Sequence, residues 1–227
     1  MIVRLFALLA LLTAGSAHAL TLSDLSNKDA VGGLKEALTQ GAGKAVQVLC
    51  RSDGFLGNPK VKIPLPENLQ KAEGLMRGMG MGKQADELVT AMNRAAEASV
   101  PEAKALLVNS VKQMSVEDAK AILSGGDDAA TRYFRRTTSA PLTAKFQPIV
   151  TKAIARVKLA EKYEKFAGKA AKFGLVKEED IHLENYVARK ALDGLYLMIA
   201  EEERAIRKNP VGAAGNLAKK AFGALVK

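Results

Sequence analysis

Ionisable side chains are concentrated in residues 124–136, Ser-Gly-Gly-Asp-Asp-Ala-Ala-Thr-Arg-Tyr-Phe-Arg-Arg. The stretch supplies two neighbouring carboxylates, those of Asp127 and Asp128. It also supplies three guanidinium groups, those of Arg132, Arg135 and Arg136. A carboxylate pair can bind a metal ion or transfer a proton, and nearby arginines can hold an anionic substrate. These residue types therefore admit a metal-dependent or acid/base hydrolase.

The same stretch has an architectural interpretation, which we favour. Gly125 and Gly126 follow an apolar helical run, and glycine tolerates the left-handed conformation that ends many helices. Asp127 is then expected to cap the next helix with its carboxylate, and Asp128 to lie in the first turn, where the helix dipole favours negative charge. Because Asp128 and Arg132 are four residues apart, an ion pair between them is the alternative to an anion site.

A second ionic cluster, Glu201, Glu202 and Glu203, follows the apolar run at residues 191–200. Helical spacing predicts ion pairs of Glu203 with Arg207 and of Glu201 with Arg204. In the hydrolase hypothesis, these glutamates would instead join Asp127 and Asp128 in one cleft, with Arg132 and Arg136 as an anion clamp.

Four other residue types bear on chemistry. Asp193, inside the apolar run, can pair with Arg189 or with an arginine of residues 124–136. His182 is the sole histidine beyond residue 19, so neither a zinc site nor a catalytic triad is recognisable. The methionines at 76, 79 and 81 favour core packing over copper binding. Cys50 is the only cysteine, which excludes an intrachain disulfide, and we expect its thiol to be buried. No metal or cofactor is predicted.

Residues 1–19 are typical of a secretory signal peptide. Arg4 precedes an apolar run at residues 5–12, and Ala17-His18-Ala19 places small residues where a signal peptidase reads them. Cleavage leaves residues 20–227 as a single helical domain, periplasmic or secreted. No later apolar run reaches the roughly 18 to 20 residues that span a bilayer.

The formal net charge of +10 favours anionic partners. Export argues against nucleic acid and leaves lipid, cell-wall polymer or an envelope protein. A final predicted helix over residues 211–226 has a narrow apolar stripe beside lysines. It is a candidate for peripheral membrane contact.

Helical periodicity covers most of the chain and predicts an all-α, multi-helix bundle-like domain. The helices are expected at residues 23–49, 67–77, 83–114, 115–124, 129–138, after Pro141 and Pro148, at 187–208 and at 211–226. Pro101 should kink or divide the third of these. Ser115-Val116-Glu117-Asp118 is a capping-box-like start for the fourth.

One segment, residues 51–66, is rich in proline and glycine and cannot be helical. It is expected to form a small hairpin or an ordered lid over the core. Its apolar side chains, Phe55, Leu56, Ile63 and Leu65, are expected to plug the helical core, although a long apolar loop is also a candidate ligand site.

Four segments carry a resemblance to a family of exported bacterial proteins classified as a domain of unknown function, DUF4197. They are residues 53–66 (Asp-Gly-Phe-Leu-Gly-Asn-Pro through Ile-Pro-Leu-Pro), 92–97 (Met-Asn-Arg-Ala-Ala-Glu), 125–138 and 190–203. The resemblance covers nearly the whole chain after the signal peptide. It implies an all-helical exported protein, and it implies no reaction or ligand.

The leading functional hypothesis is a non-catalytic helical module that binds an apolar or amphiphilic ligand or an envelope partner. The candidate binding residues are Phe55, Leu56, Ile63, Arg132, Tyr133, Arg135, Arg136 and Asp193. The hydrolase is the alternative, and a purely structural or assembly role is a third possibility.

Overall fold

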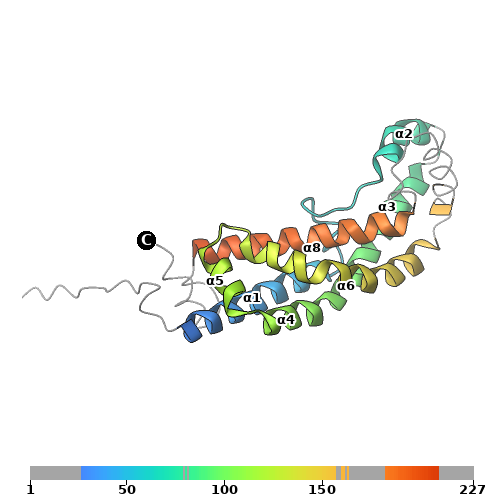
Figure 1. Ribbon diagram of the computed structural model, residues 1–227. Coiled ribbons are helices and arrows are strands. Elements are labelled where there is room, and N and C mark those ends of the chain that lie inside the picture. Colours follow the sequence, from blue (N-terminus) through green and yellow to red (C-terminus); the bar gives the residue numbers. More distant parts are fainter. Residues whose placement is uncertain are drawn as a thin grey trace, which may run out of the picture.

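The computed structural model describes residues 27–78, 80, 82–156, 160, 161, 163 and 182–209. Within these ranges all regular elements are helical, which confirms the all-α prediction. Four helices run side by side to form an elongated bundle (Figure 1): α1 (Asn27–Leu49), α4 (Ala103–Gln113), α6 (Ala129–Ile154) and α8 (Leu183–Lys208). α2 (Glu67–Gly78) and the start of α3 (Gly82–Ser99) lie at one end.

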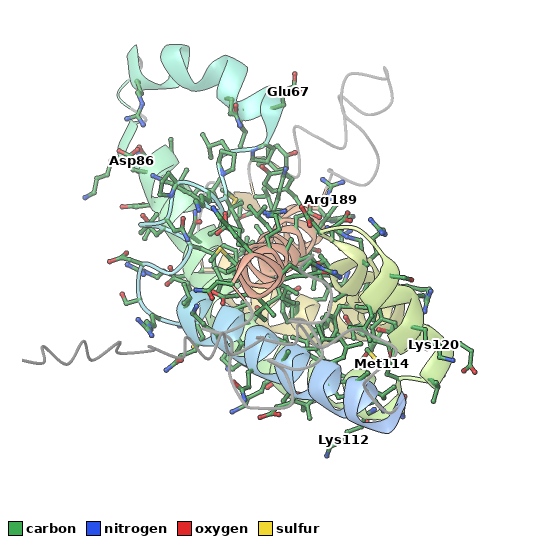
Figure 2. The ribbon with its side chains drawn as sticks, turned by 90° about the vertical axis from the view of Figure 1, so that its left-hand side faces the viewer. Glu67, Asp86, Lys112, Met114, Lys120 and Arg189 are labelled. Carbon is green, nitrogen blue, oxygen red and sulfur yellow. The ribbon has the colours of Figure 1, made fainter. Side chains whose placement is uncertain are left out.

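α8 is the centre of the bundle. It is seen end on in the middle of Figure 2, with the other helices around it. A helix that is apolar on most of its circumference must be covered on most sides, because each exposed apolar side chain forfeits the free energy of leaving water. This confirms the predicted central helix, which begins at Leu183, about one turn earlier than expected. Its buried apolar side chains include Leu183, Val187, Leu192, Leu195, Tyr196 and Ile199.

The predicted helix boundaries at Pro101 and Ser115 are confirmed. Pro101 lies in a short 3-10 turn, η1 (Val100–Glu102), which separates α3 from α4. α5 (Val116–Ser124) begins with a complete capping box, in which the Ser115 hydroxyl accepts from the Asp118 N–H and the Asp118 carboxylate accepts from the Ser115 N–H.

α6 passes through both of its prolines, so the predicted division after residue 138 is wrong. Pro141 and Pro148 lie inside one helix, and both face solvent. Each removes one backbone hydrogen bond. Packing outweighs that loss, because one face of the same stretch is deeply buried. The buried side chains of this face are Leu142, Phe146, Val150 and Ile154.

The segment between α1 and α2 packs on the core as expected, but it does so without a hairpin. Phe55, Ile63 and Leu65 are buried, and Leu56 is half-buried. The backbone groups of Phe55, Leu56 and Ile63 pair with polar side chains of α3. The Asn93 amide donates to the Ile63 carbonyl and accepts from the Ile63 N–H, both at 2.8 Å.

Glu97 holds the other half of this segment. One of its carboxylate oxygens accepts from the N–H groups of Phe55 (3.1 Å) and Leu56 (3.2 Å). The other oxygen accepts from Arg94 at 2.7 Å. Side chains of a helix thus satisfy the buried backbone groups that a second strand would otherwise satisfy.

Two predicted segments lie outside the described residues: the signal peptide at 1–19 and the last helix at 211–226. Of the described helices, none has the length and apolar character needed to cross a bilayer.

The Phe55 ring packs directly on the α8 backbone at Gly194. A methyl group at residue 194 would lie 2.7 Å from a Phe55 ring carbon and 3.2 Å from the Val61 Cβ. We expect Gly194→Ala to lower the free energy of unfolding by about 1–3 kcal/mol, because the fully buried ring has no space to retreat. Urea denaturation monitored by circular dichroism measures the change.

Gly32→Ala in α1 is the matched control, because nothing lies within 4 Å of the added methyl. Alanine propagates a helix better than glycine by up to about 1 kcal/mol, so this variant should be neutral or stabilised. Stabilisation of both variants would contradict the close packing of Phe55 on α8.

Candidate functional site

α5 ends at Gly125, where neighbouring atoms lie too close to the backbone for a side chain to fit. Gly125 has an extended backbone (φ −82°, ψ 172°), and no positive φ occurs at Gly126, so the predicted left-handed closure is wrong. A Cβ on Gly125 would lie 2.6 Å from the Ala129 Cβ and 2.7 Å from the Ala121 carbonyl oxygen. Glycine is therefore required because the chain turns back on itself without room for a side chain.

The N-terminus of α6 is capped by a carboxylate from α8. Glu203 accepts from the Ala130 N–H at 2.9 Å, and from both the Thr131 N–H (2.9 Å) and the Thr131 hydroxyl (2.8 Å). The first N–H groups of a helix lack intrahelical acceptors, and the helix dipole attracts negative charge there. Glu203, on a helix distant in sequence, supplies both the hydrogen-bond acceptors and the negative charge.

Arg207 completes this arrangement. Its guanidinium binds Glu203 at 2.9 Å, which confirms the predicted pair, and it donates to the Ile122 carbonyl of α5 at 2.8 Å. A weaker contact, at 3.4 Å, reaches the Gly125 carbonyl. The Glu203 side chain is 2% exposed and that of Arg207 is 12% exposed. We call Glu203, Arg207 and the two helix ends that they bind the Glu203 node.

The Glu203 node explains why the predicted role of Asp127 is wrong. The cap position belongs to Asp128, whose side chain makes no hydrogen bond to the helix N-terminus, and Asp127 is exposed. Glu203 occupies the N–H groups that an aspartate would otherwise bind. Asp128 forms an ion pair with Arg132, as the spacing predicted.

Two other candidate residues of this stretch join helices. The Arg136 guanidinium binds Asp118 of α5 at 2.7 Å and lies over the Tyr133 ring. Tyr133 is buried, and its hydroxyl donates to the Ser110 carbonyl of α4 at 2.7 Å. Arg132, Tyr133 and Arg136 therefore all have structural partners.

Arg135 and Asp193 differ from the other candidates because they line a pocket. They form an ion pair at 3.2 Å, which confirms that Asp193 pairs with an arginine of residues 124–136. The pocket lies between α6 and α8 and has a volume of about 460 Å³. Its other lining residues are Ser139, Thr143, Gln147, Asn185, Arg189, Leu192 and Tyr196.

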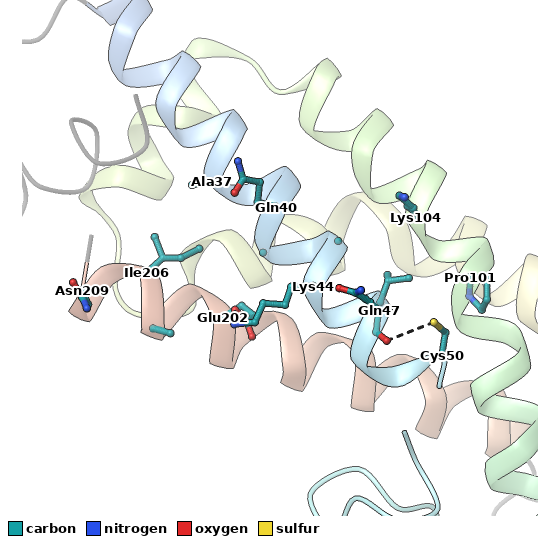
Figure 3. A pocket seen from close by; sticks show the side chains of 14 residues that line it. Ala37, Gln40, Lys44, Gln47, Cys50, Pro101, Lys104, Glu202, Ile206 and Asn209 are labelled. Atoms are coloured by element: carbon teal, nitrogen blue, oxygen red, sulfur yellow. Dashed lines mark hydrogen bonds and ion pairs between the residues drawn. The ribbon is translucent and has the colours of Figure 1, made fainter. Parts of the chain in front are cut away.

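A larger groove, of about 1000 Å³, runs between α1 and the C-terminal end of α8 and reaches η1 and the start of α4. Figure 3 shows Lys44 and Glu202 together on one part of its wall, and Cys50 near Pro101 on another. Sequence reasoning missed this groove, because small residues of α1 form it and their spacing also fits a buried helix face. It is lined by Ala37, Gln40, Gly41, Gly43, Lys44, Val46, Gln47, Cys50, Pro101, Lys104, Glu202, Ala205, Ile206 and Asn209.

Cys50 corrects another expectation. Its thiol is exposed, whereas burial was predicted. The residue follows the last turn of α1, where the helix leaves the core, and its Sγ contacts only the Gln47 carbonyl at 3.6 Å among the interactions of the described chain.

The three glutamates of the hydrolase hypothesis are bound to different cations. Glu201 pairs with Lys60 at 2.7 Å instead of the predicted Arg204, and Glu202 pairs with Lys44 at 2.8 Å. In the described part of the chain, no three His, Cys, Asp or Glu side chains form a group that could hold a metal ion. His182 is exposed at the start of α8, as expected.

Comparison with known proteins identifies one family. A family model described as "Protein of unknown function (DUF4197)" matches residues 24–223. No curated protein and no solved structure matches the chain.

Loss of the Glu203 charge should destabilise the whole domain. Glu203→Gln removes the partner of a cation that is almost fully buried, which typically costs about 3–5 kcal/mol. The matched control, Glu201→Gln, breaks a more exposed pair and should cost at most about 1 kcal/mol. Denaturant unfolding of the two variants tests this difference, and equal losses would show that the Glu203 node contributes little to stability.

Asp118 should make folding sensitive to acid. Burial alone would raise the pKa of its carboxyl, but hydrogen bonds from Ser115 and Arg136 together hold the pKa below its ordinary value. The stability that it contributes is therefore present above the unfolded pKa of about 3.9 and is lost as the pH falls through the lower folded pKa. We expect the difference in unfolding free energy between wild type and Asp118→Asn to shrink when urea titrations are carried out at about pH 2 instead of about pH 6. A constant difference would contradict this role.

Proposed function

The chain belongs to the DUF4197 family, and we propose that it is an exported, non-catalytic module that binds an anionic amphiphile in the groove between α1 and α8. The observation that carries this proposal is the composition of the groove. Apolar side chains of both helices line it together with two lysines, Lys44 and Lys104.

The size and the apolar lining residues of the groove suit an acyl chain. Ligand pockets typically measure about 300–1000 Å³ and are mainly apolar, with a few placed polar groups that orient the ligand. The apolar contributions here come from Ala37 and Val46 of α1, Pro101 of η1, and Ala205 and Ile206 of α8. Gly41 and Gly43 also line the groove on the α1 side, where no side chain projects from them into it.

The charged residues of the groove favour an anionic head group. Lys44 is held by Glu202, but its side chain is still 62% exposed. Lys104 lines the same groove and has no ion-pair partner among the described residues. A cation that is free of a protein carboxylate can bind a phosphate or carboxylate without first breaking an internal pair.

Two features of the sequence support this assignment. The signal-peptide pattern at residues 1–19 supports export to a compartment bounded by anionic lipid. The net charge of +10 favours encounter with such ligands. The ion pairs of Asp128, just before α6, and of the acidic residues of α8 favour binding over hydrolysis.

Cys50 makes the proposal directly measurable, because the only thiol of the chain lines the groove and is exposed. A bound acyl chain should shield it from a maleimide. With lysophosphatidylglycerol at ten times its Kd, kept below the concentration at which it forms micelles, alkylation should slow by roughly tenfold. Mass spectrometry of the intact protein follows the reaction.

Three comparisons define the site. Lysophosphatidylcholine with the same acyl chain should protect less, because its head group has no net charge. Lys104→Glu should weaken protection by lysophosphatidylglycerol, whereas Lys112→Glu, on the same helix but outside the groove, should not. Ala205→Trp, which fills the groove from an exposed position, should abolish ligand-dependent protection. Unchanged alkylation of the wild type at saturating lipid would overturn the proposal.

A further inference from the structure

The smaller pocket between α6 and α8 is a separate feature of the molecule. Its lining comes from Arg135, Ser139, Thr143 and Gln147 of α6 and from residues 185–196 of α8, whereas the larger groove uses residues 202–209 of α8. The two therefore share no lining residue. Most of its lining residues are polar or charged, although the greater part of the surface that they expose in the pocket is apolar, and a guanidinium and a carboxylate lie side by side in it.

The ion pair in this pocket is long and exposed to solvent. Arg135 and Asp193 are joined by one contact of 3.2 Å, and their side chains are 52% and 49% exposed. Charge-assisted bonds between guanidinium and carboxylate groups are usually about 2.7–2.9 Å long and often bidentate. Each partner can therefore accept a ligand group of opposite charge without losing a strong internal bond.

The Arg135 guanidinium is nonetheless held in position. It lies 4.6 Å from the centroid of the Tyr196 ring, at a distance where the ring attracts a cation. Tyr196 is itself buried, and its hydroxyl bonds to the hydroxyls of Thr138 (2.9 Å) and Ser139 (3.1 Å). The cation is thus positioned by a fixed ring, and its pairing with Asp193 is not needed to hold it.

The remaining wall combines the apolar side chain of Leu192 with neutral polar groups and one more cation. Gln147 donates to Asn185 across the pocket at 2.7 Å. The Ser139 and Thr143 hydroxyls donate to backbone carbonyls of their own helix. The Ser139 oxygen also bonds to the Tyr196 hydroxyl, whereas the lone pairs of the Thr143 oxygen are left available as acceptors. Arg189 adds a second guanidinium to the lining.

From this juxtaposition of Arg135 and Asp193 we propose that the pocket binds a compact zwitterion of the α-amino-acid class. The ligand's carboxylate lies on Arg135, and its ammonium group lies on Asp193. A simple anion is disfavoured because Asp193 adjoins the guanidinium, and a simple cation is disfavoured by the two arginines. The volume of about 460 Å³ admits a ligand of this size with its side chain.

Isothermal titration calorimetry with a panel of L-amino acids tests the proposal on the full mature chain. We expect at least one member of the panel to bind with a Kd of about 1 mM or tighter. For the best member, two analogues separate the charges: the corresponding acid without its ammonium group, and the corresponding carboxamide without its carboxylate. Each analogue should bind at least about tenfold more weakly, which corresponds to one charge-assisted contact.

Two variants assign these contacts. Arg135→Gln should abolish binding of the amino acid. Asp193→Asn should weaken the amino acid to the level of its ammonium-free analogue, whose own affinity should not fall. Arg132→Gln is the matched control, because its ion pair with Asp128 is on the same helix but outside the pocket. Circular dichroism confirms that each exposed substitution leaves the fold intact.

Three outcomes would overturn the inference. In the first, no amino acid binds at about 10 mM, where even a weak site would be filled. In the second, the ammonium-free acid binds the wild type as well as the amino acid does. In the third, Arg135→Gln binds like the wild type. Because the titration uses another pocket and another ligand class, its failure does not bear on the groove between α1 and α8.

Discussion

The fold depends on a buried carboxylate that serves a helix other than its own. Glu203 of α8 binds the first N–H groups of α6, a segment 73 residues away, and Arg207 extends the contact to the last carbonyls of α5. These groups are taken out of water, so each must be satisfied by another. The end of α5, the start of α6 and the C-terminal half of α8 are consequently fixed together.

The same device appears beside the middle of α8. Asn93 and Glu97 of α3 bind the backbone of residues 55–63, and the Phe55 ring then fills the space above Gly194. The segments that carry the family resemblance meet in pairs: residues 53–66 contact 92–97, and residues 125–138 contact 190–203. Each pair joins buried polar groups, whose geometry tolerates little change.

Local rules predicted most of the helices, because apolar periodicity, Pro101 and the capping box at Ser115 act through neighbouring residues. They failed where a distant group intervened. Glu203 replaced Asp127 as the cap of α6, and packing of Leu142 and Phe146 carried α6 through its prolines. Asp193 pairs with Arg135, one of the two kinds of partner left open for it. The two pockets depend on how α8 lies against α1 and α6, which helical spacing alone does not specify.

If the Glu203 node supports the architecture, the ionic residues that form it hold helices together, and the two proposed ligand sites lie elsewhere along α8. Amide hydrogen exchange at Ala130 and Thr131 tests this claim most directly. First-turn N–H groups usually exchange rapidly because they lack acceptors. We predict that these two N–H groups exchange only when the whole domain unfolds, with the same free energy as denaturant unfolding. Exchange as fast as that of an exposed first turn would contradict it.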